Sequence, residues 1–168
     1  MKRTIETERL IIRPIEVDDA QAAFVWLSDP RVNRYMPYPL YTDVDQAIEW
    51  ISALKEESNE FVFVLKDSGL VIGAGSIKPQ ENRLWEVGYQ LRYDYWNKGY
   101  TTEAAKAMIK WAYDYCNARE FMARHATANV ASGKVLQKCG YKFDRYGKYN
   151  RYDGSETFEA TYYKMSIK

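Results

Sequence analysis

Apolar residues in the first sixty positions follow strand spacing once and helical spacing twice. The run Leu10-Ile11-Ile12 predicts a short strand, and Asp18-Asp19 offers a cap for the helix that follows it. The prolines in the ring-rich stretch 35–41 exclude a regular helix, so we expect a loop with apolar content. Capping residues and helical spacing then predict a second helix over residues 42–57.

The remaining chain changes from strand spacing to an alternation of helices and strands. Two apolar runs, 61–65 and 70–74, flank turn residues and predict a hairpin, and 84–91 predicts a third strand beside it. Further elements are expected at 99–116 (helix), 121–127 (strand), 130–139 (helix), 141–149 (strand) and 158–165 (strand). The order β-α-α-β-β-β-α-β-α-β-β predicts one domain over residues 1–168, an α/β fold of the α+β type whose mixed central sheet has helices on both faces.

Composition narrows the classes of function. The net charge of +1 argues against nucleic acid as a partner, because binding a phosphate backbone requires a basic excess. No run approaches the roughly 20 apolar residues of a membrane span. Two cysteines, Cys116 and Cys139, and the lone His125 indicate neither a disulfide framework nor a metal site. These features favour a cytoplasmic protein, with His125 in a structural role.

Charge is unevenly distributed between the halves of the chain. Residues 1–84 hold 10 Lys+Arg against 14 Asp+Glu, a balance of −4, and the remaining residues hold 14 against 9, a balance of +5. A basic second half is compatible with a small polyanionic ligand, and equally with a solvated surface.

A candidate anion site lies where a strand ends and a helix begins, at residues 96–102. The first N–H groups of a helix lack partners and lie at the positive end of its dipole, so they can bind a phosphate. Gly99 permits close approach to the backbone, Lys98 adds charge, and Thr101 and Thr102 add hydroxyl groups. The alternative is that Gly99 only caps the helix.

This segment resembles the CoA-binding motif of the GNAT superfamily of N-acetyltransferases, in particular its RimJ/RimL-type branch. The family pattern Q/R-x-x-G-x-G/A falls on residues 96–101, with Gly99 as the central glycine, Trp96 in the first position and Thr101 in the last. Residues 7–14, 29–32, 86–89 and 129–132 resemble other stretches of the branch in the same order. The resemblance implies a GNAT-like fold and transfer of an acetyl group from acetyl-CoA, with no metal.

The resemblance also implies how the co-substrate is held. The backbone of Tyr89, Gln90 and Leu91 would pair with the pantetheine arm as if it were an added strand. Asn129 would contact the co-substrate as well. The amides around residues 98–101 would bind the diphosphate. The cofactor-binding residues of the loop and the first turn would be Trp96, Asn97, Lys98, Gly99, Tyr100, Thr101 and Thr102.

Acetyl transfer to an amine requires a base and an acid. Glu86 matches a carboxylate position that the superfamily uses, with Glu159 in reserve, and its alternative is a structural strand carboxylate. The tyrosine that many family members use as the acid is replaced by Leu136, which makes Ser132 the candidate acid, unless its hydroxyl only caps the helix. Family analogy assigns the acceptor side to the 35–41 loop, with Tyr35, Tyr38 and Tyr41.

We therefore expect an N-acetyltransferase acting on a primary amine by direct attack in a ternary complex. Candidate acceptors are the α-amine of a protein N-terminus and small molecules, including antibiotics. The alternative is a CoA-binding module of GNAT fold without turnover. Cys116 and Cys139 end apolar helix stripes, where a thiol behaves as a buried hydrophobe, so a covalent acetyl-cysteine route is not favoured. Neither nucleic acid nor membrane is an expected partner, and the chain is expected to be a monomer or a homodimer.

Overall fold

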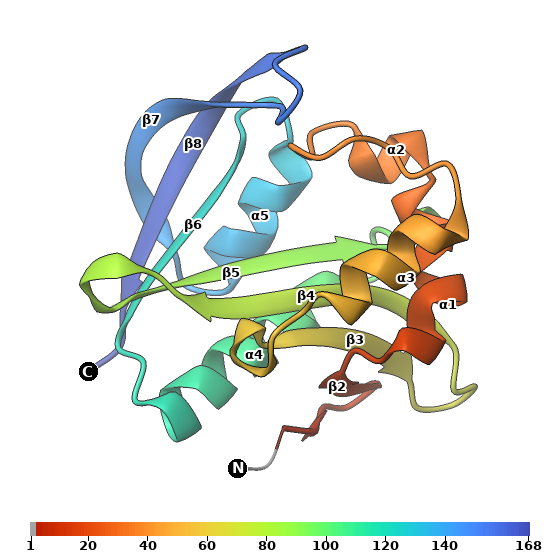
Figure 1. Cartoon of the computed structure of the whole chain (residues 1–168). Coiled ribbons are helices and arrows are strands. Elements are labelled where there is room, and N and C mark those ends of the chain that lie inside the picture. The colour runs from red at the N-terminus through yellow and green to blue at the C-terminus, as the bar shows by residue number, and fades with distance from the viewer. Residues whose placement is uncertain (1–2) are drawn as a thin grey trace.

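The computed structural model describes residues 3–168, which form an eight-stranded sheet with helices packed against it (Figure 1). The strands are β1 (Ile5–Glu6), β2 (Leu10–Pro14), β3 (Glu60–Leu65), β4 (Val71–Pro79), β5 (Leu84–Leu91), β6 (Glu120–Ala126), β7 (Lys142–Asn150) and β8 (Thr157–Ser166). The helices are α1 (Ala20–Leu27), α2 (Pro30–Asn33), α3 (Val44–Ser52), α4 (Tyr100–Cys116) and α5 (Val130–Lys138).

The sheet is mixed, in the order β1-β2-β3-β4-β5-β6-β8-β7. Strand β5 pairs with β6 in parallel, and the other neighbouring strands pair antiparallel. This arrangement confirms the predicted mixed α/β fold. Within residues 3–168, no helix combines the length and the apolar character needed to cross a bilayer.

Helices cover both faces of the sheet, as two adjacent residues of β4 illustrate. Ala74 belongs to a buried cluster with α1 and α3. A Cβ atom at the next residue, Gly75, would lie 2.8 Å from the Met108 side chain of α4. Because neighbouring strand residues point to opposite faces, α1 and α3 lie on one face and α4 on the other. Leu136 of α5 joins the buried cluster of α4, which places both helices on the same face.

Local chemistry explains two differences from the sequence prediction. The short helix α2 was not expected; the Asp29 side chain accepts a hydrogen bond from Arg31 N at 2.9 Å, and Pro30 occupies the first turn, which together start a helix. Helix α3 ends at Ser52 rather than near residue 57. Lys55 is extended, with φ −88° and ψ 155°, so it separates α3 from the short 3-10 turn over Glu56–Ser58.

The functional site lies where the sheet separates. Strands β5 and β6 are paired only from Leu84–Glu120 to Glu86–Met122. Beyond Glu86 the two strands diverge, and Figure 1 shows α5 and the β7–β8 pair on one side of the opening, with α2 across from them. Parallel strands that separate at their carboxyl ends leave a crevice between them, a favoured place for a ligand.

Candidate active site

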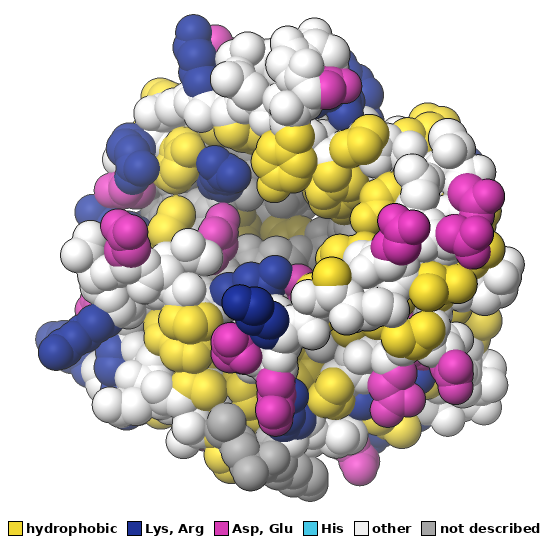
Figure 2. All heavy atoms as spheres, in the orientation of Figure 1, with side chains coloured by type: hydrophobic (Ala, Val, Ile, Leu, Met, Phe, Trp, Pro, Cys, Tyr) yellow, Lys and Arg dark blue, Asp and Glu magenta, His cyan; other side chains and the backbone are white. Residues whose placement is uncertain are grey.

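A cleft of about 1200 Å³ occupies the opening between β5 and β6. Its lining comes from both faces of the sheet, from α4 and α5 on one side and from the α2 region and β7 on the other. Figure 2 shows it as a hollow near the centre of this face, edged by hydrophobic, acidic and basic side chains. Pockets for a single small ligand typically measure roughly 300–1,000 Å³, so this cleft is larger than a typical small-ligand pocket.

One wall of the cleft is the free edge of β5. Gln80 N donates to Leu84 O at 2.7 Å and Arg92 N donates to Ile72 O at 2.8 Å, so even-numbered residues of β5 bond to β4. The backbone groups of Tyr89 and Leu91 therefore face the cleft, beyond the last residue paired with β6. The backbone of Gln90 faces β4 instead, which leaves its side chain as its contribution to the cleft.

The floor of the cleft is the first turn of α4. The first backbone bond of this helix runs from Glu103 N to Gly99 O at 3.1 Å, so the N–H groups of Tyr100, Thr101 and Thr102 have no acceptor in the helix. Gly99 has a φ of +82°, the left-handed conformation that favours glycine, and its turn aims these N–H groups toward the cleft. The anion site predicted from the sequence requires such a helix N-terminus with free N–H groups.

Two charged residues that were not predicted brace this turn. Arg9 donates from Nη1 to the Lys98 carbonyl at 2.9 Å and from Nε to Glu103 Oε2 at 2.8 Å. Its guanidinium lies 4.0 Å from the centroid of the Tyr100 ring. Glu103 also accepts from Thr7 Oγ1 at 2.6 Å and from Arg9 N at 2.8 Å. The signal was present in the matching stretch 7–14, which the sequence interpretation assigned only to the first strand.

This network fixes Glu103 in its ionised form. Partial burial opposes the charge, but hydrogen bonds from Thr7 and Arg9 hold the pKa of the Glu103 carboxyl below its ordinary value. The carboxylate in turn holds Arg9 against the loop, so the chain segment before β2 positions the turn at Gly99.

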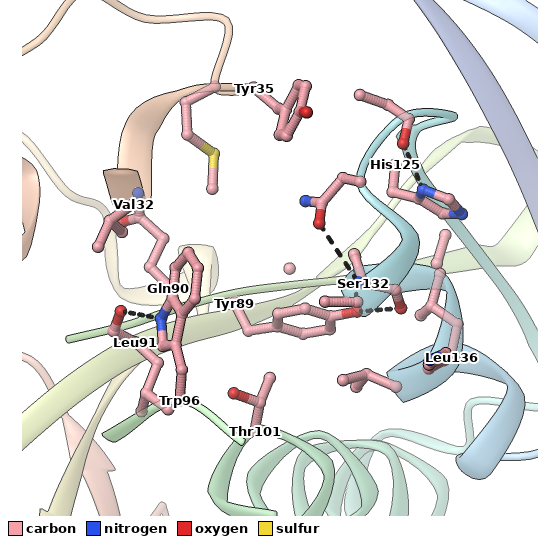
Figure 3. Close-up of a pocket in the computed structure, with 18 of the residues that line it drawn as sticks. Val32, Tyr35, Tyr89, Gln90, Leu91, Trp96, Thr101, His125, Ser132 and Leu136 are labelled. Carbon is pink, nitrogen blue, oxygen red and sulfur yellow. Dashed lines mark hydrogen bonds between the residues drawn. The ribbon is translucent and has the colours of Figure 1, made fainter. Parts of the chain in front are cut away.

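Of the loop residues before Gly99, Trp96 and Asn97 line the cleft and Lys98 does not. Trp96 lines the cleft and donates its indole N–H to Leu91 O at 2.8 Å, which closes the free edge of β5 (Figure 3). Asn97 also lines the cleft, with a φ of +61°. Lys98 contributes its carbonyl to the Arg9 brace, and its Nζ lies 5.3 Å from the centroid of the Tyr95 ring.

The start of α5 forms a third wall. Asn129 caps this helix, accepting from Ser132 N at 3.4 Å. The Ser132 hydroxyl lies 3.0 Å from the Tyr89 hydroxyl, which also donates to Ser132 O at 3.2 Å (Figure 3). Burial raises the pKa of Tyr89 well above its ordinary value, although the bond with Ser132 lowers it, so Tyr89 stays protonated. The sequence interpretation used only the backbone of Tyr89 and missed its hydroxyl.

The two candidate bases lie in different surroundings. Glu86 lines the cleft at the point where β5 and β6 part, and within residues 3–168 it has no ion-pair partner closer than 4 Å. Its cross-strand neighbour Lys78 pairs with Glu60 instead. Glu159, the reserve candidate, lies on β8 with its side chain 70% exposed and 3.4 Å from Lys148, away from the cleft.

Of the three tyrosines expected on the acceptor side, Tyr35 lines the cleft. Tyr38 packs against the cluster of α1 and α3, where its hydroxyl accepts a hydrogen bond from the side chain of Gln90. Tyr41 packs against the same cluster and meets the Tyr38 ring edge-on, with centroids 6.2 Å apart. The structure therefore brings Tyr35 to the cleft and places Tyr38 and Tyr41 behind its wall.

The two thiols lie outside the cleft lining, whereas His125 lines the cleft as a neutral ring. Burial raises the pKa of the Cys139 thiol to about 11 and raises that of Cys116, so both stay protonated and poorly nucleophilic. His125 is buried, stacks on Tyr163, and bonds through Nδ1 to the carbonyl of Ala126. Burial lowers its pKa and keeps the ring neutral. Among the described residues, no group of three or more His, Cys, Asp or Glu side chains could hold a metal ion.

Comparisons with known proteins identify the family of this chain. Residues 9–142 match the family described as acetyltransferase (GNAT) domain. An uncharacterized N-acetyltransferase, p20, from Bacillus licheniformis is 32% identical over 146 residues, covering 83% of this chain and 82% of that protein. The crystal structure of a GNAT-family acetyltransferase from Bacillus anthracis has a TM-score of 0.88 and 25% identity, covering 97% of this chain and 98% of the other.

A more distant structure shares the fold alone. It is a microcin self immunity acetyltransferase in complex with acetyl-CoA and AMP, with a TM-score of 0.81 and 16% identity, covering 96% of this chain and 94% of that one. Since the matched family spans most of the sequence and the sheet, helix and cleft follow its fold, the chain belongs to the acetyltransferase (GNAT) family and is an acyltransferase.

Proposed function

We propose that this protein is an acetyl-CoA-dependent N-acetyltransferase that acts on a primary amine by direct attack in a ternary complex. The observation that carries the proposal is the free edge of β5 leading to the unpaired N–H groups of Tyr100, Thr101 and Thr102. An extended amide-bearing arm can pair with Tyr89 and Leu91, and a diphosphate can bind the helix N-terminus beyond them. CoA has both parts in that order.

Glu86 is the proposed base. A carboxylate without an ion-pair partner, at the point where the strands part, can accept a proton from the attacking amine directly or through water. The proposed donor to the carbonyl oxygen, as negative charge develops on it, is whichever backbone N–H of the free edge between Tyr89 and Leu91 the arm leaves unpaired.

Ser132 is the proposed acid, supported by Tyr89. As the carbon–sulfur bond breaks, the Ser132 hydroxyl gives its proton to the leaving sulfur, and the Tyr89 hydroxyl 3.0 Å away can replace that proton. This pair stands in for the tyrosine that the family pattern would place at Leu136. The protonated cysteines lie outside the cleft lining, which favours direct transfer over an acetyl-cysteine step.

The test follows free thiol while the protein is incubated with acetyl-CoA and a panel of primary amines, and calorimetry measures CoA binding separately. The panel includes short peptides with free N-termini, because the RimJ/RimL resemblance makes a protein N-terminus a candidate acceptor. Thiol release that requires an amine supports the proposal. Tight binding of CoA without release by any amine indicates a binding module, and the absence of CoA binding contradicts the proposal altogether.

A variant can link activity to the proposed diphosphate site. Thr101→Trp places a large ring over the first turn of α4 and should raise the acetyl-CoA dissociation constant at least about tenfold, because it blocks the approach of an anion. Gly99 is a poorer target, since its φ of +82° strains any other residue and confuses binding with folding. A thermal melt confirms that Thr101→Trp remains folded.

A further inference from the structure

The arginines that line the acceptor side of the cleft, opposite α4, differ in whether a carboxylate of the chain neutralises them. Arg31 pairs with Asp29 at 2.7 Å and Arg34 pairs with Glu156 at 3.1 Å, so both are neutralised within the chain. Arg124 of β6 also lines the cleft, yet within residues 3–168 it has no carboxylate closer than 4 Å. Its charge is therefore available to a ligand.

Aromatic residues hold Arg124 in place and use one of its hydrogen-bond donors. Its Nη1 donates to the Tyr162 hydroxyl at 3.4 Å, and its guanidinium lies 5.1 Å from the centroid of the Tyr149 ring. A guanidinium carries five N–H donors in a planar fork that fits the two oxygens of a carboxylate or a phosphate. Most of that fork remains unused.

Arg124 and the proposed base lie on the same side of the sheet. Glu86 is the cross-strand neighbour of Met122, and Arg124 lies two residues further along β6, about 7 Å away along the strand. Partial burial opposes the charge of Arg124, but the Tyr162 hydroxyl and the nearby carboxylate of Glu86 raise its pKa. The cleft thus presents a carboxylate and a guanidinium that are close but not paired with each other.

Residues 34–37 are hydrogen-bonded to residues 149–152 across the acceptor side of the cleft. This connection limits the size of an acceptor. Tyr149 Oη donates to Tyr35 O at 2.7 Å, and Tyr152 N donates to Pro37 O at 2.8 Å. Arg151 adds bonds to Met36 O at 3.1 Å and to Arg34 O at 2.9 Å. In Figure 1 this segment, after α2, meets the end of the β7–β8 pair. These bonds and the Arg34–Glu156 ion pair join segments far apart in sequence and close this side against a bulky chain.

Taken with the proposed function, on which this inference rests, we propose that Arg124 binds an oxyanion of the acceptor. The acceptor is then a small amine that carries a carboxylate or a phosphate-type group a few bonds from its amino group. Its amine lies toward Glu86 and its anion toward Arg124. A neutral peptide N-terminus lacks the second group and fits the site less well.

The test compares matched acceptors in the thiol-release assay. Each pair consists of an amino acid and its carboxamide, for example glycine with glycinamide and β-alanine with its amide, and aminomethylphosphonate is added to separate carboxylate from phosphate-type recognition. We expect kcat/KM for the acid to exceed that for the amide at least about tenfold, since a charge-assisted bidentate contact is lost in the amide.

Substitutions assign the preference to one side chain. Arg124→Gln should lower the acid-to-amide ratio at least about tenfold through KM for the acceptor, with KM for acetyl-CoA unchanged, and Arg124→Lys should restore part of the ratio. The amines of the acid and the amide differ in basicity, but this difference is the same for every variant. It therefore cancels when the acid-to-amide ratios of two variants are compared. Arg145→Gln is the matched control, because Arg145 lies 4.2 Å from the Tyr162 ring but does not line the cleft.

The outcomes separate this inference from the transferase proposal. If amides and neutral peptides are acetylated as well as acids, and Arg124→Gln leaves the ratio unchanged, the role of Arg124 is wrong while the transferase proposal stands. If no amine is acetylated although acetyl-CoA binds, the transferase proposal fails, and this inference fails with it. A folded Arg124→Lys variant that keeps part of the acid preference supports the inference even if Arg124→Gln is unstable.

Discussion

The two halves of the cleft, the cofactor half and the acceptor half, present different kinds of group to a ligand. The half formed by β5 and α4 offers backbone groups: the edge groups of Tyr89 and Leu91, and the N–H groups at the start of α4. The acceptor half offers side chains, among them Glu86, Arg124 and Tyr35, from segments far apart in sequence. Backbone recognition depends on local conformation, whereas side-chain recognition depends on which residues the whole fold brings together.

The difference also appears in how each half is held in place. The turn at Gly99 is braced by Arg9 and Glu103, which lie on the strand-entry segment and on α4 itself. The acceptor half is held by contacts between residues 34–37 and the β7–β8 end, such as the bond from Tyr149 to Tyr35 O. Substitutions can therefore impair one half and leave the other intact.

The largest effect is expected from Glu86→Gln, which removes the proposed base from the acceptor half. We expect kcat/KM for the acceptor to fall by about 100-fold or more, with the dissociation constant of acetyl-CoA unchanged. Steady-state kinetics and calorimetry measure the two quantities. Glu159→Gln is the matched control, since this carboxylate is 70% exposed on β8. Equal losses in both variants would remove Glu86 from the mechanism.

A smaller effect is expected where the halves meet, at the Tyr89–Ser132 pair. Ser132→Ala and Tyr89→Phe should each lower kcat by roughly tenfold, and the double variant should lose little more than the larger single effect, because the two hydroxyls act as one unit. Tyr115→Phe, at a residue 54% exposed on α4, controls for removal of a tyrosine hydroxyl. Fully additive losses would mean that the two hydroxyls act independently.

The smallest effect is expected in the brace of the cofactor half, and it depends on pH. The pKa of Glu103 is below its ordinary value of 4.5, so its contribution is present above pH 4.5 and is lost as pH falls through the lowered pKa. At pH 6, Glu103→Gln should raise the dissociation constant of acetyl-CoA by about threefold to tenfold, because one charge-assisted bond to Arg9 is weakened.

The same comparison at lower pH tests whether the negative charge of Glu103 causes the difference in acetyl-CoA affinity. Calorimetry from pH 6 down to the lowest pH at which the protein stays folded should show the difference between wild type and Glu103→Gln narrowing below pH 4.5, as the wild-type carboxylate takes up a proton. The phosphate groups of CoA titrate in the same way with both proteins, so their effect cancels in the difference between wild type and variant. Glu49→Gln, at an exposed residue of α3, should match wild type throughout. A constant difference would mean that the charge of Glu103 does not hold the turn.

Sequence reasoning was most successful where structure is set locally. The strand 84–91 and the helix after Gly99 follow from apolar spacing and one glycine, and both lie as predicted. The Arg9–Glu103 brace joins residues 94 positions apart, and no periodic pattern marks it. The contact of Tyr89 with Ser132 spans 43 positions and likewise depends on the way α5 packs beside β5.

The acceptor side was the least predictable part. Family analogy assigned Tyr35, Tyr38 and Tyr41 to it, but only packing decides that Tyr35 faces the cleft while Tyr38 and Tyr41 support α1 and α3. Arg124 gave no signal, because an arginine in a strand is unremarkable until its neighbours are known to lack a carboxylate for it.

The bond from the Trp96 indole to Leu91 O sets a length limit. It occupies the last backbone carbonyl on the open side of β5, so an extended ligand can pair with β5 only as far as the Trp96 ring. Beyond the ring such a ligand would have to bend toward the start of α4. The length of β5 between Trp96 and Glu86 therefore sets how far along the strand a bound thioester could extend.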